Sequence, residues 1–561
     1  MTDPRSEHMI DSPGPALKTG PRRRFLRAGQ LIGLGISGLI LTGTTVANRR
    51  ADGATDAMIS VYVGGGILLL WLTSWLLIFN RQSFRKRVVL VALIAMAVVG
   101  FRLSVREVWF DGDMRPRARF VWNQPSPQDR AQQWLSENAP STPLSQNGDP
   151  APLQITSADW AEYCGPGRNR IVSEALSTLD WETSPPLELW RRPVGQAWSS
   201  CAIADGLLFT QEQRQQQECV VCYDANTGEE LWRHEDIARY DTAQGAVGPR
   251  ATPTVTPEAV FALGATGILN ALQPRSGRLL WTTNICADAE SDMVEWGMSG
   301  SPLIYEDTVI VDAGSASDRG IAAYAMKDGS KVWSSGSHKA GYTSPRLETL
   351  LGKTTLLVFH GDGLEALTPN DGTSLWFYPW TNQYKINVAQ PMLWNEQIFL
   401  SSGYDSGCVL LDPARLKPLA GDASVQTPTE VWPRNRSLKL KFNEAVLFQD
   451  HVYGLDDGIL ACIRAADGKR LWKRGRYKFG HVLLWQDKLL VQAEDGDVAV
   501  VEATPDDFRE LTRFTALSDR TWNVPVLNRG RLYVRNAAEL ACFQLPAGVV
   551  PTNGAEGKAA E

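Results

Sequence analysis

A short pattern of glycine and tryptophan recurs along this chain and limits the folds open to it. It is clearest from Asp224 to Trp232, where a strand end, a tight turn at Gly228 and a new strand carrying Trp232 are predicted. Glycine suits this turn because one position takes a positive φ. The same step of four residues joins Gly277 to Trp281, Gly329 to Trp333, Gly372 to Trp376, and Gly468 to Trp472.

The tryptophans of this pattern recur at intervals of roughly 40 to 55 residues, the signature of a β-propeller. A small four-stranded sheet cannot bury both faces alone, but it can when stacked radially against neighbours. Each ring would then stabilise a contact between blades by about 2–3 kcal/mol. The predicted structural tryptophans are Trp190, Trp232, Trp281, Trp333, Trp376, Trp432 and Trp472.

The repeat, which reads C-x-D-x-x-T-G-x-x-x-W from Cys222, resembles the A-x-D-x-x-T-G-x-x-x-W repeat of the quinoprotein, or PQQ-like, propellers over roughly residues 160–545. These propellers are typically eight-bladed, and they include quinoprotein alcohol dehydrogenases and the propeller lipoprotein of outer-membrane β-barrel assembly. The resemblance implies an all-β propeller domain of four-stranded antiparallel blades at 159–545. It says less about function, because propellers host many activities.

The two ends of the repeat region complement each other. Residues 187–192, around Trp190, form a tryptophan strand with no blade before it, whereas 523–544 supply three strands without a tryptophan. We predict that 187–192 complete the last blade and leave no open sheet edge. The eight blades are then expected near 193–233, 249–282, 299–334, 341–377, 388–433, 443–473, 480–513, and 523–544 with 187–192.

Three apolar segments precede the propeller. We expect a disordered cytoplasmic tail at 1–24, transmembrane helices near 28–47, 57–79 and 88–104, a linker at 105–158 and a disordered tail at 546–561. The excess of Lys and Arg before the first helix and between the second and third places the N-terminus inside. The propeller is therefore expected outside the inner membrane, in the periplasm. The segment Arg22–Arg27 reads either as positive anchors or as a twin-arginine signal, and both readings give this location.

The segment from Trp160 to Arg170 is rich in glycine and in charge. Its W-x-x-Y-C-G-P-G-R-N order resembles a segment that opens the propeller in membrane-linked PQQ-like proteins, with Cys164 where Arg is common. We expect a structural loop laid across the disc. A ligand contact through Arg168 is the alternative.

The eight cysteines favour a structural role. Cys219 and Cys222 form a C-x-x-C, but they lie in one predicted strand, where an odd separation puts them on opposite faces. Cys222, Cys462 and Cys542 share one repeat position, which predicts small buried residues in separate blades. No metal site is predicted, since no second C-x-x-C and no H-E-x-x-H or H-x-H spacing is found.

The resemblance to PQQ-dependent dehydrogenases raises an enzymatic alternative. Those enzymes use a vicinal Cys-Cys disulfide, a Trp floor under the quinone, a Ca²⁺ ion and an Asp base. This chain has no Cys-Cys pair, although its Arg250-Ala251-Thr252-Pro253 stretch resembles a segment that lines the quinone pocket. PQQ with Ca²⁺ is therefore kept as an alternative cofactor, and no catalytic residue is predicted.

A site is best sought where inner strands begin, because polar residues there face one funnel. Channel hydration and strand capping are the competing roles for these residues. The candidates are Arg250, Ser301, Thr343, Gln390, Asn443, His481 and Asn523.

Two functions remain after these arguments. The first is a membrane-tethered module that binds protein or other cell-envelope partners, favoured by the anchor and the missing catalytic set. The second is a quinoprotein-like oxidoreductase. The net charge of −6 gives no indication of nucleic-acid binding.

Overall fold

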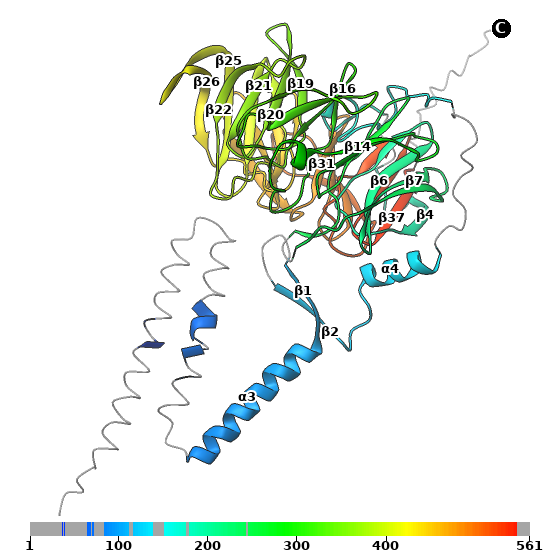
Figure 1. Cartoon of the computed structure of the whole chain (residues 1–561), viewed down its shortest axis with the longest axis vertical. Coiled ribbons are helices and arrows are strands. Elements are labelled where there is room, and N and C mark those ends of the chain that lie inside the picture. Colours follow the sequence, from blue (N-terminus) through cyan, green and yellow to red (C-terminus); the bar gives the residue numbers. More distant parts are fainter. Residues whose placement is uncertain are drawn as a thin grey trace, which may run out of the picture. The chain divides into compact units, whose positions relative to one another are not determined.

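The computed structural model describes residues 83–110, 116–138, 151–174, 179–242 and 245–546, together with scattered positions between 36 and 74. Two compact units are present. One ends at Val108 and includes 113–123, and the other contains 109–112 and everything from Gln124 onward. The first unit holds helix α3 (Phe84–Ser104), and a hairpin of β1 (Val105–Phe110) and β2 (Pro116–Phe120) follows it (Figure 1).

The membrane spans remain predictions. Helix α3 covers the third predicted span, 88–104, yet no helix among the described residues is both long and apolar enough to cross a membrane. Most of the predicted spans 28–47 and 57–79 lies outside the described residues. The same holds for the predicted tail 1–24, the Arg22–Arg27 segment and residues 547–561.

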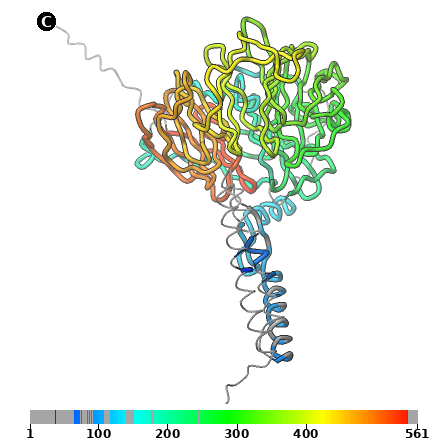
Figure 2. The backbone as a smooth tube through the Cα atoms, turned by 90° about the vertical axis from the view of Figure 1, so that its left-hand side faces the viewer, coloured from blue at the N-terminus to red at the C-terminus, as the bar shows by residue number. Residues whose placement is uncertain are grey.

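The second unit contains the propeller, in which eight antiparallel sheets follow one another along the chain (Figure 2). Blade 1 contains β5 (Ala202–Ala204), β6 (Leu207–Arg214), β7 (Gln217–Asp224) and β8 (Glu230–Ile237). Blade 2 contains β11 (Thr254–Val255), β12 (Val260–Leu263), β13 (Ile268–Leu272) and β14 (Leu279–Asn284). Blade 3 contains β15 (Leu303–Tyr305), β16 (Thr308–Asp312), β17 (Ile321–Ala325) and β18 (Lys331–Ser335). Blade 4 contains β19 (Arg346–Leu350), β20 (Lys353–Phe359), β21 (Gly363–Leu367) and β22 (Ser374–Pro379).

The second half of the ring repeats this plan. Blade 5 contains β23 (Met392–Trp394), β24 (Gln397–Ser402), β25 (Gly407–Leu419) and β26 (Asp422–Asn435). Blade 6 contains β27 (Val446–Phe448), β28 (His451–Asp456), β29 (Ile459–Arg464) and β30 (Arg470–Arg476). Blade 7 contains β31 (His481–Trp485), β32 (Lys488–Gln492), β33 (Asp497–Glu502) and β34 (Glu510–Thr515). Blade 8 contains β35 (Val526–Asn528), β36 (Arg531–Arg535) and β37 (Glu539–Gln544), and its outer strand is β4 (Leu187–Pro193).

The predicted ring closure is confirmed. Strand β4 pairs antiparallel with β37, and Trp190 lies opposite Cys542. The chain therefore supplies the fourth strand of its last blade before it builds the first. This pairing removes the two sheet edges that an open ring would expose.

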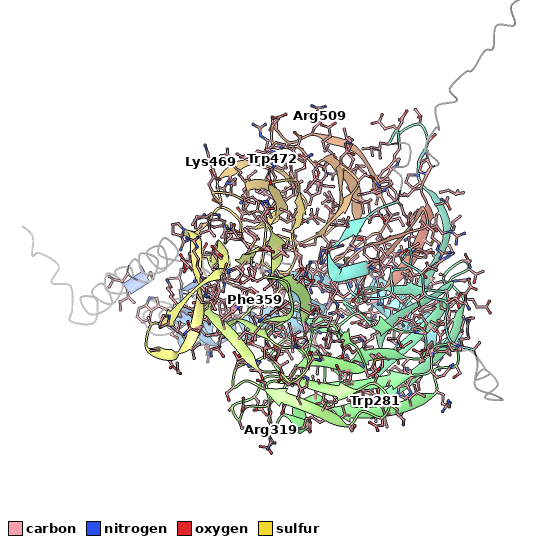
Figure 3. The ribbon with its side chains drawn as sticks, turned by 90° about the horizontal axis from the view of Figure 1, so that it is seen from above. Trp281, Arg319, Phe359, Lys469, Trp472 and Arg509 are labelled. Carbon is pink, nitrogen blue, oxygen red and sulfur yellow. The ribbon has the colours of Figure 1, made fainter. Side chains whose placement is uncertain are left out.

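The glycine–tryptophan pattern joins neighbouring blades at five of the eight junctions. The ring of Trp232 lies against Gly277 of the following blade, where an added Cβ atom would come within 2.4 Å of it. The indole Nε1 of Trp232 donates to the Pro274 carbonyl in the same turn, at 2.8 Å. The same contact between a tryptophan and a glycine recurs for Trp190 with Gly228, Trp281 with Gly329, Trp333 with Gly372, and Trp432 with Gly468. Figure 3 shows Trp281 and Trp472 in blades on opposite sides of the ring.

The eight cysteines are free and buried, in agreement with a structural role. Cys219 and Cys222 pack into different hydrophobic clusters, as expected for opposite faces of β7. Cys222 lies opposite Trp232 in the neighbouring strand, and Cys462 lies opposite Trp472. The shared repeat position is small because it faces the largest side chain of the blade.

Two elements depart from the repeat. In blade 5 an insertion lengthens β25 and β26 into one long hairpin, in which Leu416 pairs with Pro428 (Figure 1). Within the predicted linker, α4 (Pro127–Glu137) buries Ala131 and Leu135, and a reciprocal pair of hydrogen bonds between Ser126 and Asp129 caps its start. Short elements complete the described chain: β3 (Ile171–Val172), a 3₁₀ turn η1 (Pro166–Arg168), β9 (Asp241–Thr242), β10 (Ala246–Val247) and α5 (Ile285–Asp288).

Candidate functional site

The residues that directly precede the first blade cover one end of the propeller channel. Strand β3 adds to the inner strand β31 in parallel, with Ile171 opposite Leu484 near the end of that strand. At the other end of the segment, Trp160 bridges Ile203 of the inner strand β5. Between these anchors the chain winds tightly, with positive φ at Cys164, Gly165, Gly167, Arg168 and Arg170. We call residues 160–172 the closing segment, and its position agrees with the predicted loop across the disc.

Arg168 is the centre of the closing segment and is only 2% exposed. Its guanidinium donates to the carbonyl oxygens of Ser301 at 3.2 Å, Pro345 at 3.0 Å, and Pro302. These acceptors lie just before β15 and β19, so one side chain bonds the approaches to two inner strands. The side chain is thus occupied by protein contacts, which supports a structural role over the alternative of a ligand contact.

Arg170 performs the matching role for the opposite blades. It forms an ion pair with Glu444 at 3.0 Å, and both side chains are almost fully buried. The Tyr163 hydroxyl donates to the same carboxylate at 2.7 Å. Although burial disfavours the charged form of Arg170, the neighbouring Glu444, Tyr163 and Cys164 groups hold its pKa above the ordinary value. The pair therefore fixes blade 6 to the closing segment, and Arg170 also donates to the Val482 carbonyl of blade 7 at 3.4 Å.

The loops that lead into the inner strands lie on the other side of the disc from β3; we call this side the mouth, and the Arg168 and Arg170 side chains reach toward it from the closing segment. Strands alternate in direction, so the loops from each outer strand to the next blade and the loops between second and third strands meet on this side. All seven predicted funnel candidates lie on the approach to an inner strand or at its first residue, as His481 does in β31.

The candidates of blades 3 to 5 take part in hydrogen bonds that cross from blade to blade. The Thr252 amide donates to the Ser301 hydroxyl at 2.9 Å, and the Ser301 amide donates to the Ser344 hydroxyl at 2.8 Å. Gln390 continues this chain by donating to the Ser344 carbonyl at 3.2 Å. Thr343 donates to the Asn387 carbonyl at 3.1 Å in the same region. Ser301, Thr343 and Gln390 thus stitch neighbouring inner strands together.

The candidates of blades 6 to 8 are buried but incompletely bonded. Asn443 is fully buried, and neither of its amide atoms has a partner among the described residues. Asn523 donates to the Ser199 carbonyl at 2.7 Å, whereas its Oδ1 atom lacks a described partner. The Oε1 atom of Gln390 lacks one too. Such atoms are normally satisfied in proteins, so they mark where water or a ligand would bind along the axis.

His481 is held neutral at the start of β31. Its Nε2 atom donates to the Trp522 carbonyl at 2.7 Å, and Nδ1 has no described partner. Burial, followed by the nearby Arg170 charge, lowers the pKa of His481 to about 3. The imidazole therefore carries no charge at neutral pH and presents an acceptor nitrogen.

Arg250 is the charged candidate whose guanidinium lacks a carboxylate partner among the described residues. Its guanidinium lies 4.3 Å from the centre of the Tyr240 ring and donates to the backbone carbonyls of Gly248 and Gly245. None of the carboxylates that the structure describes pairs with it, and burial lowers its pKa to about 10. A cation in these surroundings favours an incoming anion.

Aromatic side chains surround this mouth. Trp198 and Trp522 pack with ring centres 5.0 Å apart, Trp522 and Phe442 are 5.9 Å apart, and Phe442 and Tyr404 are 6.4 Å apart. With them, Phe479 packs on Phe442, and Trp296 packs on Tyr342. We call these seven residues the aromatic collar. They lie in the loops on the mouth side and not in the inner strands.

Two more cations lie over the collar. The Lys441 ammonium is 5.0 Å from the Phe442 ring centre, and the Arg520 guanidinium is 4.5 Å from that of Trp522. Together with Arg250 they place three cationic groups among the aromatic rings of the mouth, where the Glu494 carboxylate also accepts from the Phe479 amide. The sequence did not reveal this cluster, because the loops that supply it share no length or spacing. The tryptophans outside the Gly-x-x-x-Trp pattern were the available signal.

The mouth meets only part of what PQQ with Ca²⁺ would need. Aromatic faces and cations would suit a planar anion. In contrast, Ca²⁺ prefers several carboxylate oxygens, and the described residues of the mouth provide no cluster of carboxylates there. The chain also lacks a Cys-Cys pair. The residues therefore do not fit the calcium-bound cofactor.

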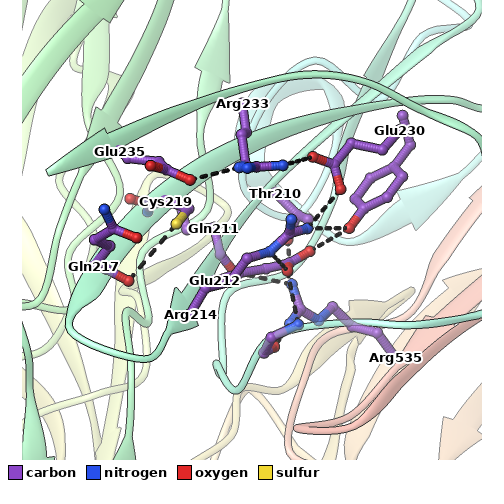
Figure 4. A network of polar contacts seen from close by, with 12 residues as sticks. Thr210, Gln211, Glu212, Arg214, Gln217, Cys219, Glu230, Arg233, Glu235 and Arg535 are labelled. Atoms are coloured by element: carbon purple, nitrogen blue, oxygen red, sulfur yellow. Dashed lines mark hydrogen bonds and ion pairs between the residues drawn. The ribbon is translucent and has the colours of Figure 1, made fainter. Parts of the chain in front are cut away.

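A second polar cluster stabilises the junction between blades 8 and 1 (Figure 4). The fully buried Glu212 carboxylate accepts from Arg214 at 2.8 Å, from the Tyr223 hydroxyl at 2.6 Å and from the Gly195 amide at 2.7 Å. Arg535 donates to the Gly195 carbonyl at 3.1 Å beside it. Burial raises the pKa of Glu212, but the two guanidiniums outweigh it and hold the pKa below the usual range. The full set of donors indicates a structural role.

The comparisons with known proteins agree with this architecture. A model of the family described as outer membrane protein assembly factor BamB matches residues 173–298 and 216–474, more than half of the chain. No curated protein sequence matches. The family match therefore relates the sequence to one family of propellers.

Two solved quinohemoprotein dehydrogenases show the same fold at low identity, and a BamB structure is a weaker match. Quinohemoprotein alcohol dehydrogenase from Comamonas testosteroni is 12% identical, with a TM-score of 0.51 over 75% of this chain and 84% of that one. The alcohol dehydrogenase ADHIIG from Pseudomonas putida HK5 is 12% identical, with a TM-score of 0.50 over 69% and 80%. BamB from Moraxella catarrhalis is 15% identical, with a TM-score of 0.46 over 64% and 99%. By its repeat, its closed eight-bladed ring and the family match, the chain belongs to the PQQ-like β-propeller family described as outer membrane protein assembly factor BamB.

Proposed function

We propose that this chain is a membrane-tethered, extracytoplasmic scaffold that binds a protein partner of the cell envelope through the mouth of its propeller. The aromatic collar with its three cations carries the proposal. Tryptophan, tyrosine and arginine are the residues on which protein interfaces most depend, and here they converge from several blades. The family description, which names outer membrane protein assembly, supports a partner of this kind.

The charge of the mouth narrows the partner. Arg250, with which none of the described carboxylates pairs, favours an acidic group in the partner, and the aromatic rings favour apolar or aromatic side chains beside that group. The closing segment fills the far end of the channel, so a partner would approach from the mouth side. A flexible acidic stretch of an envelope protein meets these conditions.

Site-specific photocrosslinking in cells tests this proposal. A photoreactive amino acid at Trp522 should give a discrete crosslinked protein, which Arg520→Glu in the same chain should reduce several-fold. The matched control is Trp394, which ends the inner strand β23 and so lies on the face of the disc away from the mouth. No crosslink at 522, or the same product at 394, would contradict binding at the mouth.

The membrane tether belongs to the same proposal. The apolar side chains of α3 that can be described are exposed, among them Val89, Leu93, Met96 and Val99. Burial of such a surface in lipid would be favourable. The full chain should resist carbonate extraction from inner membranes, and a reporter fused after residue 545 should be active only in the periplasm. A cytoplasmic reporter would refute this topology.

The oxidoreductase remains the second candidate, favoured by one feature of the mouth. Arg250 and the collar would suit a planar anionic quinone, although the calcium ligands are not there. Titration of the full chain with PQQ, with and without Ca²⁺, distinguishes the two functions. Stoichiometric quinone absorbance bound to the protein, lost in Arg250→Ala, would favour the enzyme, and its absence would favour the scaffold.

A further inference from the structure

Two histidines from neighbouring blades lie face to face near the mouth side of the ring. His338 follows the last strand of blade 3, and His360 follows β20 of blade 4. Their ring centres are 3.9 Å apart. Glu365 of β21 lies beside them, with a carboxylate oxygen 3.5 Å from the His360 Nε2 atom. One potential ligand atom from each residue lies within 4.8 Å of the others.

Nδ1 of His338 has no hydrogen-bond partner among the described residues, and Nε2 of His360 faces the Glu365 carboxylate at 3.5 Å; both histidine side chains are 2% exposed. A buried ring nitrogen without a hydrogen bond is unusual. Two imidazole nitrogens beside a carboxylate form a donor set that suits a divalent transition metal.

The surroundings of His338 resemble those of a metal ligand. Its other nitrogen, Nε2, contacts the Asp312 carboxylate at 2.9 Å. That carboxylate also accepts from the Gly341 amide at 3.1 Å, so its position is fixed. Carboxylates that bind the far nitrogen of a histidine orient the ring toward a metal and increase its basicity.

Glycines leave room for the His338 ring. A Cβ atom on Gly320 would come within 2.3 Å of the ring, and one on Gly336 would lie 3.0 Å from its Nδ1 atom and 3.4 Å from a Glu365 oxygen. The side of the cluster that faces Nδ1 is thus lined by backbone without side chains.

We propose that His338 Nδ1, His360 Nε2 and Glu365 bind one Zn²⁺ ion that joins blades 3 and 4, with Asp312 orienting His338. Zinc bonds of 2.0–2.2 Å in a tetrahedral arrangement place ligand atoms about 3.3 Å apart. The His360–Glu365 distance already meets this value. The His338 nitrogen needs to approach by about 1.5 Å at most, and because the two rings are stacked with 21° between their planes, the His338 ring must also tilt to aim its lone pair at the ion. The fourth position is left for water.

Zinc binding requires one rearrangement of a proton. The Asp362 amide lies 3.2 Å from Nδ1 of His360, which places the histidine proton on Nε2. When zinc occupies Nε2, the proton moves to Nδ1 and this amide contact is lost. No other described hydrogen bond of the three ligands has to break.

Zinc titration of the untagged full chain, after removal of metal with a chelator, tests the proposal. We expect one tightly bound Zn²⁺ per chain and a raised thermal midpoint. Glu365→Gln and His360→Gln should each weaken binding at least 100-fold, and Asp312→Asn should weaken it 10- to 100-fold. His451→Gln, a histidine of blade 6 outside the cluster, is the matched control and should bind as the wild type does.

Cobalt substitution in the unaltered chain keeps the test independent of whether the variants fold. The absorption spectrum of bound Co²⁺ should show a tetrahedral site without a thiolate charge-transfer band, because the ligands are nitrogen and oxygen. Absence of a tight site, a thiolate band, or binding that survives in both Glu365→Gln and His360→Gln would overturn the assignment.

Discussion

The contact between a tryptophan and the glycine of the next blade should contribute to stability, and a matched pair of variants can separate this contribution from backbone strain. Gly277→Ala places a methyl group 2.4 Å from the Trp232 ring, at a residue whose φ is +69°. Gly206→Ala introduces the same methyl group at a φ of +77°, where no atom lies within 4 Å. The two substitutions thus share the backbone strain and differ in the contact.

The magnitudes follow from these two terms. The left-handed conformation costs alanine about 1–2 kcal/mol relative to glycine, and this applies to both variants. The contact at Gly277 is more than 1 Å too short, and overpacking of a well-filled site costs about 1–3 kcal/mol more. We therefore expect a loss of about 1 kcal/mol for Gly206→Ala and about 3 kcal/mol for Gly277→Ala.

Urea unfolding followed by tryptophan fluorescence, on the full chain in mild detergent, measures the difference. A double variant sharpens the result, because Trp232→Leu removes the ring that the new methyl group meets. The cost of Gly277→Ala should fall toward that of Gly206→Ala in this background. Equal losses for the two single variants would show that the repeat glycine is required for its backbone conformation alone, and our account of the repeat would be refuted.

Three further predictions concern the buried charges. Because the pKa of His481 is lowered from about 6.5 to about 3, its contribution to stability is full above pH 6.5 and is lost as the pH falls toward 3. From pH 6.5 to 5 the wild type should lose about 2 kcal/mol that His481→Gln retains, and parallel urea-derived profiles of the two would contradict this. Arg170→Met should lower the free energy of unfolding by about 3–5 kcal/mol, because it leaves Glu444 buried without its ion pair. The double variant with Glu444→Met should recover most of this loss at pH 7, and no recovery would argue against the pair. Glu212 has a lowered pKa, so its contribution is present above pH 4.5 and is lost as the pH falls through the lowered value; Glu212→Gln should lower the thermal midpoint at pH 7 and flatten the acid decline, and an unchanged midpoint would exclude a stabilising role.

Much of the fold could be predicted because it depends on local pattern. The step from Gly277 to Trp281 encodes a turn and a strand whose residues are neighbours in the chain, and repetition of that step implies a ring. The closure through Trp190 followed from counting strands, since a blade with three strands needs a fourth. The membrane spans, the location and the partner remain predictions.

The candidate site was only partly accessible. The seven funnel residues could be placed at the starts of inner strands from the repeat, but their roles depend on side chains of other blades. Ser301 became a hydrogen-bonding link because Thr252 and Ser344 reach it from either side. Arg250 stayed open for a ligand because no described carboxylate reaches it. Neither the role of Ser301 nor that of Arg250 can be predicted from the residues that flank it in the sequence.

The sequence by itself determined the repeat, the number of blades and the strand that closes the ring, because these follow from turn chemistry, from strand counting and from the tryptophan that seven of the eight blades bury in their outer strand. Only the tertiary structure decided which charges are neutralised and which nitrogens lack partners. The loops of different blades converge at the mouth from positions up to several hundred residues apart. His338 and His360 belong to one cluster for this reason: the stacking of two blades, and no spacing in the chain, brings their rings together.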